Sequence, residues 1–284
     1  MPYPSRPASA RALTTLAVAS LLAGCQASSS DTSDPSRASV FGHVHGVGLN
    51  PADDTVYVAS HNGVFQIVDG TPRLIADRRQ DTMGFTIAGP DNFLASGHPD
   101  PSTNTPNPLG LIRSVDRGST WTTLSFAGQE DFHAIDAAGQ YVYAYSSAGE
   151  VLGSTDARKW APILQAKLID IAVDPQSPTQ LVATTDTGEV IAFARGENPK
   201  TLQTAPPLVL VDRTASSDIV GVDPQGRLFV SDDEGKTWLK RAELQGAPEA
   251  ISVRADTWLA ATEDGLLTSP DNGVTWEPLL KADS

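Results

Sequence analysis

Cysteine, basic side chains and helical periodicity are the features that this sequence lacks most clearly. Cys25 is the only cysteine among 284 residues, so no disulfide can form within the chain. Only 20 Lys and Arg residues stand against 34 Asp and Glu residues, which gives a net charge of −14. An acidic protein of this kind repels phosphate backbones, so we expect no nucleic acid partner. No long segment carries apolar residues at spacings of three and four, which argues against a helical fold.

The first 24 residues have the pattern of a lipoprotein signal peptide. Arg6 and Arg11 lie in a basic leader, the apolar run 13–22 follows, and Leu22-Ala-Gly-Cys25 ends it. A single cysteine directly after an apolar leader is typical of a diacylglyceryl acceptor, so we predict cleavage after residue 24 and lipidation of Cys25. We therefore expect an extracytoplasmic protein that is anchored by lipid to the cell membrane or the outer membrane.

Residues 25–39 are predicted to form a flexible tether between this anchor and the folded domain. The segment is rich in Ser, Asp, Ala and Pro and has no periodic apolar pattern. No second apolar run of transmembrane length follows it. The leader holds two arginines and no acid, so the chain without it carries a net charge of −16. The folded domain is predicted to span residues 40–284.

An octapeptide of the form Ser-x-Asp-x-Gly-x-Thr-Trp is the clearest repeat in the chain. Asp and Ser accept hydrogen bonds from backbone N–H groups in tight turns, Gly supplies a positive φ, and Thr-Trp is expected to begin a strand. Successive copies lie 40, 77 and 38 residues apart, and 77 corresponds to two steps with one copy missing, which indicates a repeat protein with a period near 38 to 40. The three full copies and one shortened copy contain Ser114, Asp116, Gly118 and Trp121; Ser231, Asp233, Gly235 and Trp238; Ser269, Asp271, Gly273 and Trp276; and Asp156 and Trp160.

On this octapeptide the chain resembles the Asp-box, or BNR-repeat, β-propellers. That group includes bacterial sialidases, sortilin-like receptors, xyloglucan-type glycosidases and photosystem assembly factors. The resemblance implies that each box lies between the third and fourth strands of a blade, on the face opposite the active or binding site. It covers the chain from Phe41 onward and predicts the fold much better than the function.

Strand patterns between turn residues divide this region into six units of four strands. The units span about residues 41–78, 81–125, 131–164, 167–204, 207–243 and 248–282. We therefore predict an all-β fold, a six-bladed β-propeller of four-stranded antiparallel blades. In such a blade, the start of the first strand and the end of the second strand share one rim.

All five histidines map to that shared rim, and they carry the main functional prediction. His43 and His45 are two residues apart at the start of the first unit, so both rings are expected on one side of a strand. Imidazole with a carboxylate or thioether suits zinc or copper. Alternatively, the histidines hydrogen-bond to the backbone at strand ends. The predicted ligand-binding residues are His43, His45, His61, Met83, His98 and His133, and the five histidines are the candidate metal ligands.

Glycoside hydrolysis is the second hypothesis for the same rim. Phrases such as His43-Val-His45-Gly46 and Asp131-Phe-His133 are similar to a subgroup of Asp-box lipoproteins that are labelled as glycosyl hydrolases because of their fold. Such enzymes need two carboxylates, or a Tyr with a Glu. A sialidase needs three arginines and an early Phe/Tyr-Arg-Ile-Pro phrase, which this chain lacks, so sialidase activity proper is disfavoured. The catalytic candidates are Asp81, Glu130, Asp131 and Tyr145.

Three classes of function therefore remain open at the level of the sequence. The leading one is a membrane-anchored propeller that binds a metal ion, another ligand or a protein through its histidine-lined rim. The second is a glycoside hydrolase, and the third is an assembly factor that contacts a glycan or another envelope protein. Whether the protein is an enzyme stays open, and we expect a monomer.

Overall fold

A computed structural model describes residues 40–254 and 256–281 of the chain. The predicted signal peptide, the lipidation site Cys25 and the tether lie outside these residues. The described part is all-β, with 24 strands and one 3₁₀ turn, η2 (Ile75–Asp77). Among the described residues, no helix is long and apolar enough to cross a membrane.

The first three blades follow one another along the chain from residue 44 to residue 165. Blade 1 contains β1 (Val44–Asn50), β2 (Thr55–Ser60), β3 (Gly63–Val68) and β4 (Thr71–Leu74). Blade 2 contains β5 (Asp81–Gly89), β6 (Asn92–His98), β7 (Leu111–Ser114) and β8 (Thr122–Ser125). Blade 3 contains β9 (Phe132–Ala138), β10 (Tyr141–Ser146), β11 (Glu150–Ser154) and β12 (Ala161–Gln165).

The other three blades complete the ring. Blade 4 contains β13 (Leu168–Val173), β14 (Gln180–Thr185), β15 (Val190–Ala194) and β16 (Lys200–Thr201). Blade 5 contains β17 (Leu210–Arg213), β18 (Ile219–Val222), β19 (Arg227–Ser231) and β20 (Leu239–Glu243). Blade 6 contains β21 (Pro248–Ser252), β22 (Trp258–Thr262), β23 (Gly265–Ser269) and β24 (Glu277–Lys281).

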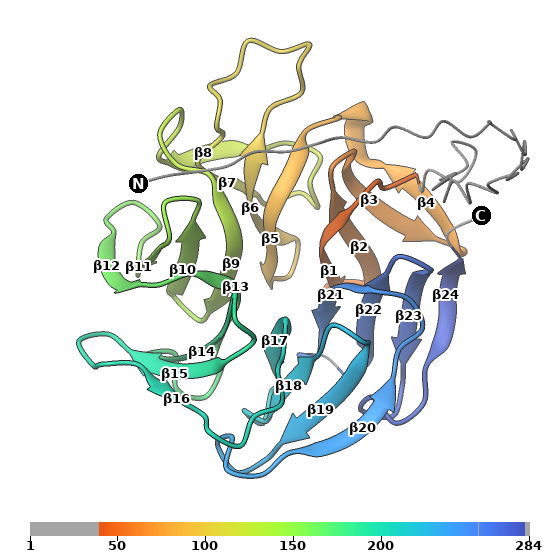
Figure 1. Cartoon of the computed structure of the whole chain (residues 1–284). Helices are drawn as coiled ribbons and strands as arrows, with labels where there is room; N and C mark the ends of the chain where they lie inside the picture. Colours follow the sequence, from red (N-terminus) through yellow and green to blue (C-terminus); the bar gives the residue numbers. More distant parts are fainter. Residues whose placement is uncertain (1–39, 255, 282–284) are drawn as a thin grey trace, which may run out of the picture. The chain divides into compact units, whose positions relative to one another are not determined.

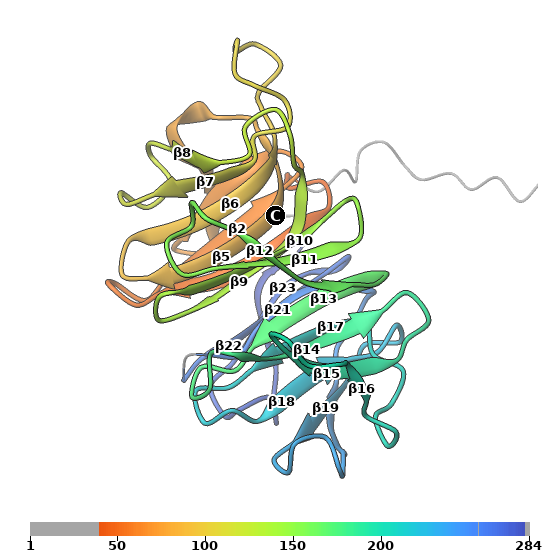
Figure 2. The ribbon, with the colours of Figure 1, turned by 90° about the vertical axis from the view of Figure 1, so that its left-hand side faces the viewer.

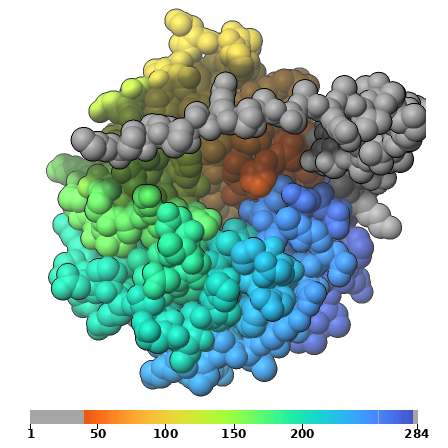
Figure 3. Space-filling model, in the orientation of Figure 1, coloured from red at the N-terminus to blue at the C-terminus, as the bar shows by residue number. Residues whose placement is uncertain are grey.

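Every blade is an antiparallel sheet of four consecutive strands, and the blades are arranged in a ring around a central axis (Figure 1). The first strand of each blade lies at the centre of the ring and the fourth at its edge. Blade 1, in orange, lies beside blade 6, in blue, so the two ends of the propeller meet (Figure 3). The loop between β6 and β7, yellow in both ribbon views, extends away from the blades (Figure 2). The predicted six-bladed propeller is confirmed.

Apolar side chains fill the space between neighbouring blades. Six buried clusters are present, and each one joins two adjacent blades, so that together they run around the whole ring. The cluster that closes the ring packs Val47 and Phe65 of blade 1 with Leu259 and Leu266 of blade 6. Within residues 40–254 and 256–281, blades 1 and 6 share no strand, and burial of this apolar surface holds the two blades together.

The repeated octapeptides form closed turns between the third and fourth strands of blades 2, 5 and 6. In blade 5, Ser231 Oγ accepts the Gly235 N–H and donates to Asp233, whose carboxylate accepts the Thr237 N–H and hydroxyl. Trp238 Nε1 donates to the Gly235 carbonyl, 3.2 Å away. The fourth strand begins just after the tryptophan, so the prediction that Thr-Trp begins it was wrong by two residues. The polar groups of the turn hydrogen-bond to one another, so we assign them a structural role.

The shortened copy in blade 3 holds its turn differently. Asp156 still accepts backbone N–H groups from Arg158 and Lys159. Without the glycine, Trp160 Nε1 donates instead to Ser125 Oγ of blade 2, 3.0 Å away. The tryptophan thus bonds to the neighbouring blade rather than to its own turn.

Candidate functional site

A cavity of about 490 Å³ lies between the six innermost strands, and β-bulges shape its mouth. Near the start of five of these strands, one residue has no partner in the ladder with the second strand. Such a bulge redirects a side chain. All five bulged residues line the cavity: His45, Met83, His133, Ile169 and Glu249.

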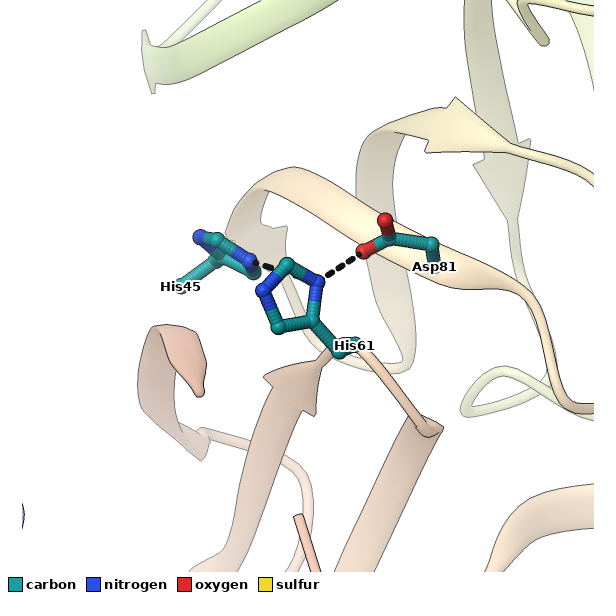
Figure 4. Close-up of side chains that lie close together, drawn as sticks. All are labelled: His45, His61 and Asp81. Atoms are coloured by element: carbon teal, nitrogen blue, oxygen red, sulfur yellow. Dashed lines mark hydrogen bonds and ion pairs between the residues drawn. The ribbon is translucent and has the colours of Figure 1, made fainter. Parts of the chain in front are cut away.

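Three side chains from blades 1 and 2 bring donor atoms together at this mouth (Figure 4). His61 lies between the other two, with its Nδ1 3.4 Å from His45 Nε2 and 2.9 Å from Asp81 Oδ1. All three donor atoms lie within 4.8 Å of one another. Two nitrogen ligands at about 2.0–2.1 Å from a tetrahedral zinc ion are about 3.3 Å apart. His45 and His61 therefore already have the spacing of two ligands of one ion.

His43 lies close to this group but has a different partner. Its ring meets that of His45 edge-on, with 4.8 Å between the centroids. Its Nδ1, however, lies 2.8 Å from Glu249 Oε1 of blade 6. Both rings line the cavity, as expected from their spacing, although His43 precedes β1 and His45 is bulged. The structure pairs His45 with His61 rather than with His43.

Asp131 connects the remaining two histidines at the same mouth. Its Oδ2 lies 2.9 Å from His133 Nε2 and 3.5 Å from His98 Nε2. His98 Nδ1 in turn lies 2.7 Å from Asn107 Oδ1, in the loop between β6 and β7. All five histidines thus lie in two neighbouring groups, one around Asp81 and one around Asp131, and only His43 also contacts blade 6.

The two groups differ in protonation. Burial, together with the neighbouring His61 and His43 rings, lowers the pKa of His45 to about 4. The hydrogen bond with Asp131 raises the pKa of His133 above 6.5. At neutral pH the His45 ring is therefore uncharged and has a nitrogen lone pair for a ligand, whereas the contact with Asp131 favours the protonated form of His133.

Below the mouth, acidic side chains of the innermost strands connect each blade to the next. Each carboxylate accepts the backbone N–H of a residue in the innermost strand of the following blade, or just after it, which satisfies buried polar groups on both sides. Four of the six junctions have such a bond: Asp136 to Val173 at 2.7 Å, Asp170 to Val211 at 2.9 Å, Asp212 to Val253 at 2.9 Å, and Glu249 to Val44 at 3.2 Å.

Arg254 closes the channel at the end away from the histidines. It follows β21 in blade 6, and its guanidinium donates to the Asp136 carboxylate and, at 2.7 Å, to the Ala137 carbonyl of blade 3. Its Nε lies 3.4 Å from Asp212 Oδ1 of blade 5. Blades 3 and 6 are opposite each other in a ring of six, so this side chain crosses the central axis. The cavity is therefore open at the histidine mouth and blocked behind it.

The channel wall holds more carboxylates than Arg254 can neutralise, and two of them have raised pKa values. Burial raises the pKa of Asp170 to about 7, and the charges of Asp212 and Asp136 act in the same direction. Burial likewise raises the pKa of Asp212, against the attraction of Arg254. The channel wall thus carries an excess of acid that is only partly compensated.

Two of the predicted catalytic residues lie away from His45, His61 and Asp81. Glu130 lies two residues before β9 and is not among the residues that line the cavity. The Tyr145 hydroxyl donates to the Ala166 carbonyl at 3.3 Å and accepts the Leu168 N–H at 3.0 Å, so it bonds to the segment that leads into blade 4. Met83, by contrast, lines the cavity beside the histidines.

Sequence reasoning did not single out Glu249 or the charged residues of the channel interior. A usable signal was present for the interior, because Asp170 and Asp212 are isolated acids within short apolar strands. An acid at such a position needs a buried partner. For Glu249 we find no comparable signal, since its partner His43 is 206 residues away in the chain.

Comparison with known proteins supports the fold of this chain. No family model matches the sequence, and no curated protein matches it. Virginiamycin B lyase from Staphylococcus aureus superposes with a TM-score of 0.55 and 14% identity, over 83% of this chain and 84% of that one. A structure of YCF48 bound to a D1 peptide gives a TM-score of 0.50 and 17% identity, over 78% and 76%. Likeness at such low identity concerns the fold alone, and this chain is a six-bladed β-propeller.

Proposed function

We propose that the channel mouth binds a transition-metal ion, zinc or copper, through His45, His61 and Asp81. The observation that carries this proposal is the convergence of two imidazole nitrogens and one carboxylate oxygen within 4.8 Å of one another. Imidazole and carboxylate are common ligands of zinc, and imidazole also suits copper. Three protein ligands would leave a fourth position for water or another ligand.

Proton sharing explains this arrangement less well than an ion does. His61 Nδ1 faces both His45 Nε2 and Asp81 Oδ1, but a ring nitrogen carries at most one proton. One N–H group directed at the carboxylate cannot also make a linear bond to His45, which is 3.4 Å away. A cation between the three atoms would satisfy all of them at once.

The geometry favours metal binding over glycoside hydrolysis. A glycosidase needs one carboxyl group as the acid and a second as the nucleophile or base. Asp81 and Asp131, the two candidates nearest the mouth, both lie within hydrogen-bonding distance of imidazole rings. Both carboxylates are thus engaged with imidazoles: Asp81 is placed to share an ion with His61, and Asp131 to orient His133, a common role of carboxylates near metal sites.

Metal content and metal affinity test the proposal directly. We expect the untagged full-length protein, purified in detergent without chelators, to hold about one zinc or copper ion per chain by mass spectrometry. His45→Ala and His61→Ala should each weaken the affinity in calorimetric titration by at least about 100-fold, since loss of a supporting residue alone often costs about 10–100-fold. His98→Ala is the matched control and should keep the ion. An empty protein, or equal affinity in all four forms, would refute the proposal.

The setting of this site is part of the same proposal. The leader pattern and Cys25 support a lipid anchor that holds the propeller at an extracytoplasmic membrane surface. Cys25→Ser should move the protein from the membrane fraction to the soluble fraction. Retention of the variant in the membrane would show that something other than a lipid on Cys25 holds it there.

A further inference from the structure

We propose that the channel behind the metal site binds a small, uncharged nitrogen-donor ligand whose donor atom completes the coordination of the ion and whose apolar body enters the cavity. An alkyl-substituted imidazole represents this chemical class. The inference rests on the proposed metal site and extends it from an ion to the molecule that the ion would hold.

The position of His45 relates the ion to the cavity. His45 is one of the three converging groups and also lines the cavity, whereas His61 and Asp81 lie outside its wall. The protein ligands therefore come from one side, and the open position faces the channel. His43 is the nearest further imidazole, but its Nδ1 is engaged by Glu249. An exogenous donor can then take the fourth position, as water or substrate does in zinc sites with three protein ligands.

The shape of the cavity fits a small molecule. Its volume of about 490 Å³ lies within the roughly 300–1,000 Å³ of typical ligand pockets. Arg254 reaches across the far end, where it donates to Asp136 and Ala137, and so narrows the cavity there. A ligand held by the ion would therefore extend into a narrowing pocket instead of through the ring.

The channel wall offers apolar surface that remains partly exposed. Ile169, the bulged residue of blade 4, is 42% exposed although it is a large hydrophobic side chain. Leu49, Ile87 and Ile251 line the same cavity and are only partly buried. Covering such surface with an apolar ligand would be favourable.

Charge restricts the ligand further. The wall includes the carboxylates of Asp136, Asp170, Asp212 and Glu249, and its single guanidinium, that of Arg254, already donates to Asp136. Burial in this channel already disfavours the charged forms of Asp170 and Asp212, and it would disfavour a carboxylate or phosphate ligand for the same reason. A neutral nitrogen donor avoids this cost and suits zinc or copper.

Cobalt substitution allows ion binding and ligand binding to be measured separately. The full-length protein would be loaded with Co²⁺, whose visible spectrum reports its ligands, and titrated with 1-methyl-, 1-propyl- and 1-pentylimidazole and with hexanoate. We expect a spectral change with each imidazole and affinities that rise by up to about fourfold per added methylene, the value for a fully buried CH₂. Hexanoate should bind more weakly than 1-pentylimidazole.

Two tryptophan variants locate the apolar body of the ligand. Ile169→Trp should fill the mouth and abolish the dependence on chain length while Co²⁺ still binds. Leu239→Trp changes a residue that is 63% exposed on an outermost strand, and it should behave as the unmodified protein does.

The possible outcomes separate this inference from the proposed function. A chain-length gain that Ile169→Trp removes supports it. If the imidazoles change the spectrum but their affinity does not rise with chain length, the inference is wrong and the metal site still stands. The same holds if the affinity rises with chain length in Ile169→Trp as well. Equal or tighter binding of hexanoate overturns the predicted ligand class. Failure to bind Co²⁺ refutes the metal site itself, and with it this inference.

Discussion

The mouth and the interior of the channel both concentrate ionisable side chains, but they differ in what those side chains contact. At the mouth, histidines and carboxylates contact mainly one another, and His43 and His61 are 50% and 45% exposed. In the interior, Asp136 and Asp212 are only 9% and 14% exposed, and each accepts a backbone N–H from the next blade.

This difference indicates which cluster can take a ligand. A carboxylate bonded to the backbone of two blades is part of the framework, and removing its partner leaves an unsatisfied buried group. Exposed side chains that contact one another can exchange those contacts for an ion at little cost. We therefore assign the interior cluster to stability and the mouth cluster to binding, and four variants test this division.

Arg254→Met should have the largest effect on stability. It removes the cation that bonds to Asp136 and faces Asp212, and it leaves these acids without a counter-charge. We expect a loss of about 3 kcal/mol in the free energy of unfolding, the lower end for a broken buried ion pair, because a quarter of Arg254 is exposed. Urea denaturation measures this. Arg241→Met, on an outer strand, is the matched control, and an equal loss in both variants would contradict the division.

Asp170→Asn should change how stability depends on pH. The folded protein keeps a proton on Asp170 up to about pH 7, whereas the unfolded chain loses it near pH 3.8. The folded state therefore binds more protons between these values, and this contribution to stability falls as the pH rises through them. From pH 5 to pH 7 we expect this loss to be on the order of 1–2 kcal/mol.

The charges of Asp212 and Asp136 also raise the pKa of Asp170, so the unmodified protein, which keeps both neighbours, serves as the reference. Thermal denaturation of both proteins across this pH range isolates the contribution of Asp170. Parallel curves for the two proteins would show that Asp170 is ionised in the folded state.

Glu249→Ala tests a residue that belongs to both regions. Glu249 contacts His43 at the mouth and accepts the Val44 N–H, which connects blade 6 to blade 1. Losing this acceptor should cost about 1–2 kcal/mol of unfolding free energy, as expected for an unsatisfied buried donor. Glu249→Gln keeps an oxygen for Val44 and should lose less. If both variants are as stable as the unmodified protein, the junction does not depend on this side chain.

His45→Ala should have the smallest effect on stability. Its ring contacts other side chains at the mouth and makes no described bond to the backbone of another blade. We expect a change within about 0.5 kcal/mol in urea denaturation of the metal-free protein. A loss as large as that of Arg254→Met would mean that the mouth histidines are structural.

The sequence predicted the ring well and the mouth only in part. The octapeptides and the alternation of strands and turns were sufficient for six blades, because these signals are local. The histidines could be placed on one rim by topology alone. Their partners could not, because His61 and Asp81 come from other segments and reach His45 only in the folded ring.

The contacts that the sequence analysis did not predict are mainly those between residues far apart in the chain. Glu249 meets His43 across 206 residues, and Arg254 meets Asp136 across 118 residues. Neither pair has a short-range spacing that the sequence could reveal. Both contacts form because ring closure brings blade 6 beside blade 1 and opposite blade 3.

By itself the sequence determined the all-β repeat, the turns that hold each blade and the concentration of histidine in the first half of the chain. These follow from local physics, in which turn geometry, strand periodicity and side-chain hydrogen bonds act over a few residues. Only the tertiary structure decided that His45, His61 and Asp81 converge and that Arg254 closes the channel behind them. Bulges and ring closure set those distances, and both depend on how whole blades pack together.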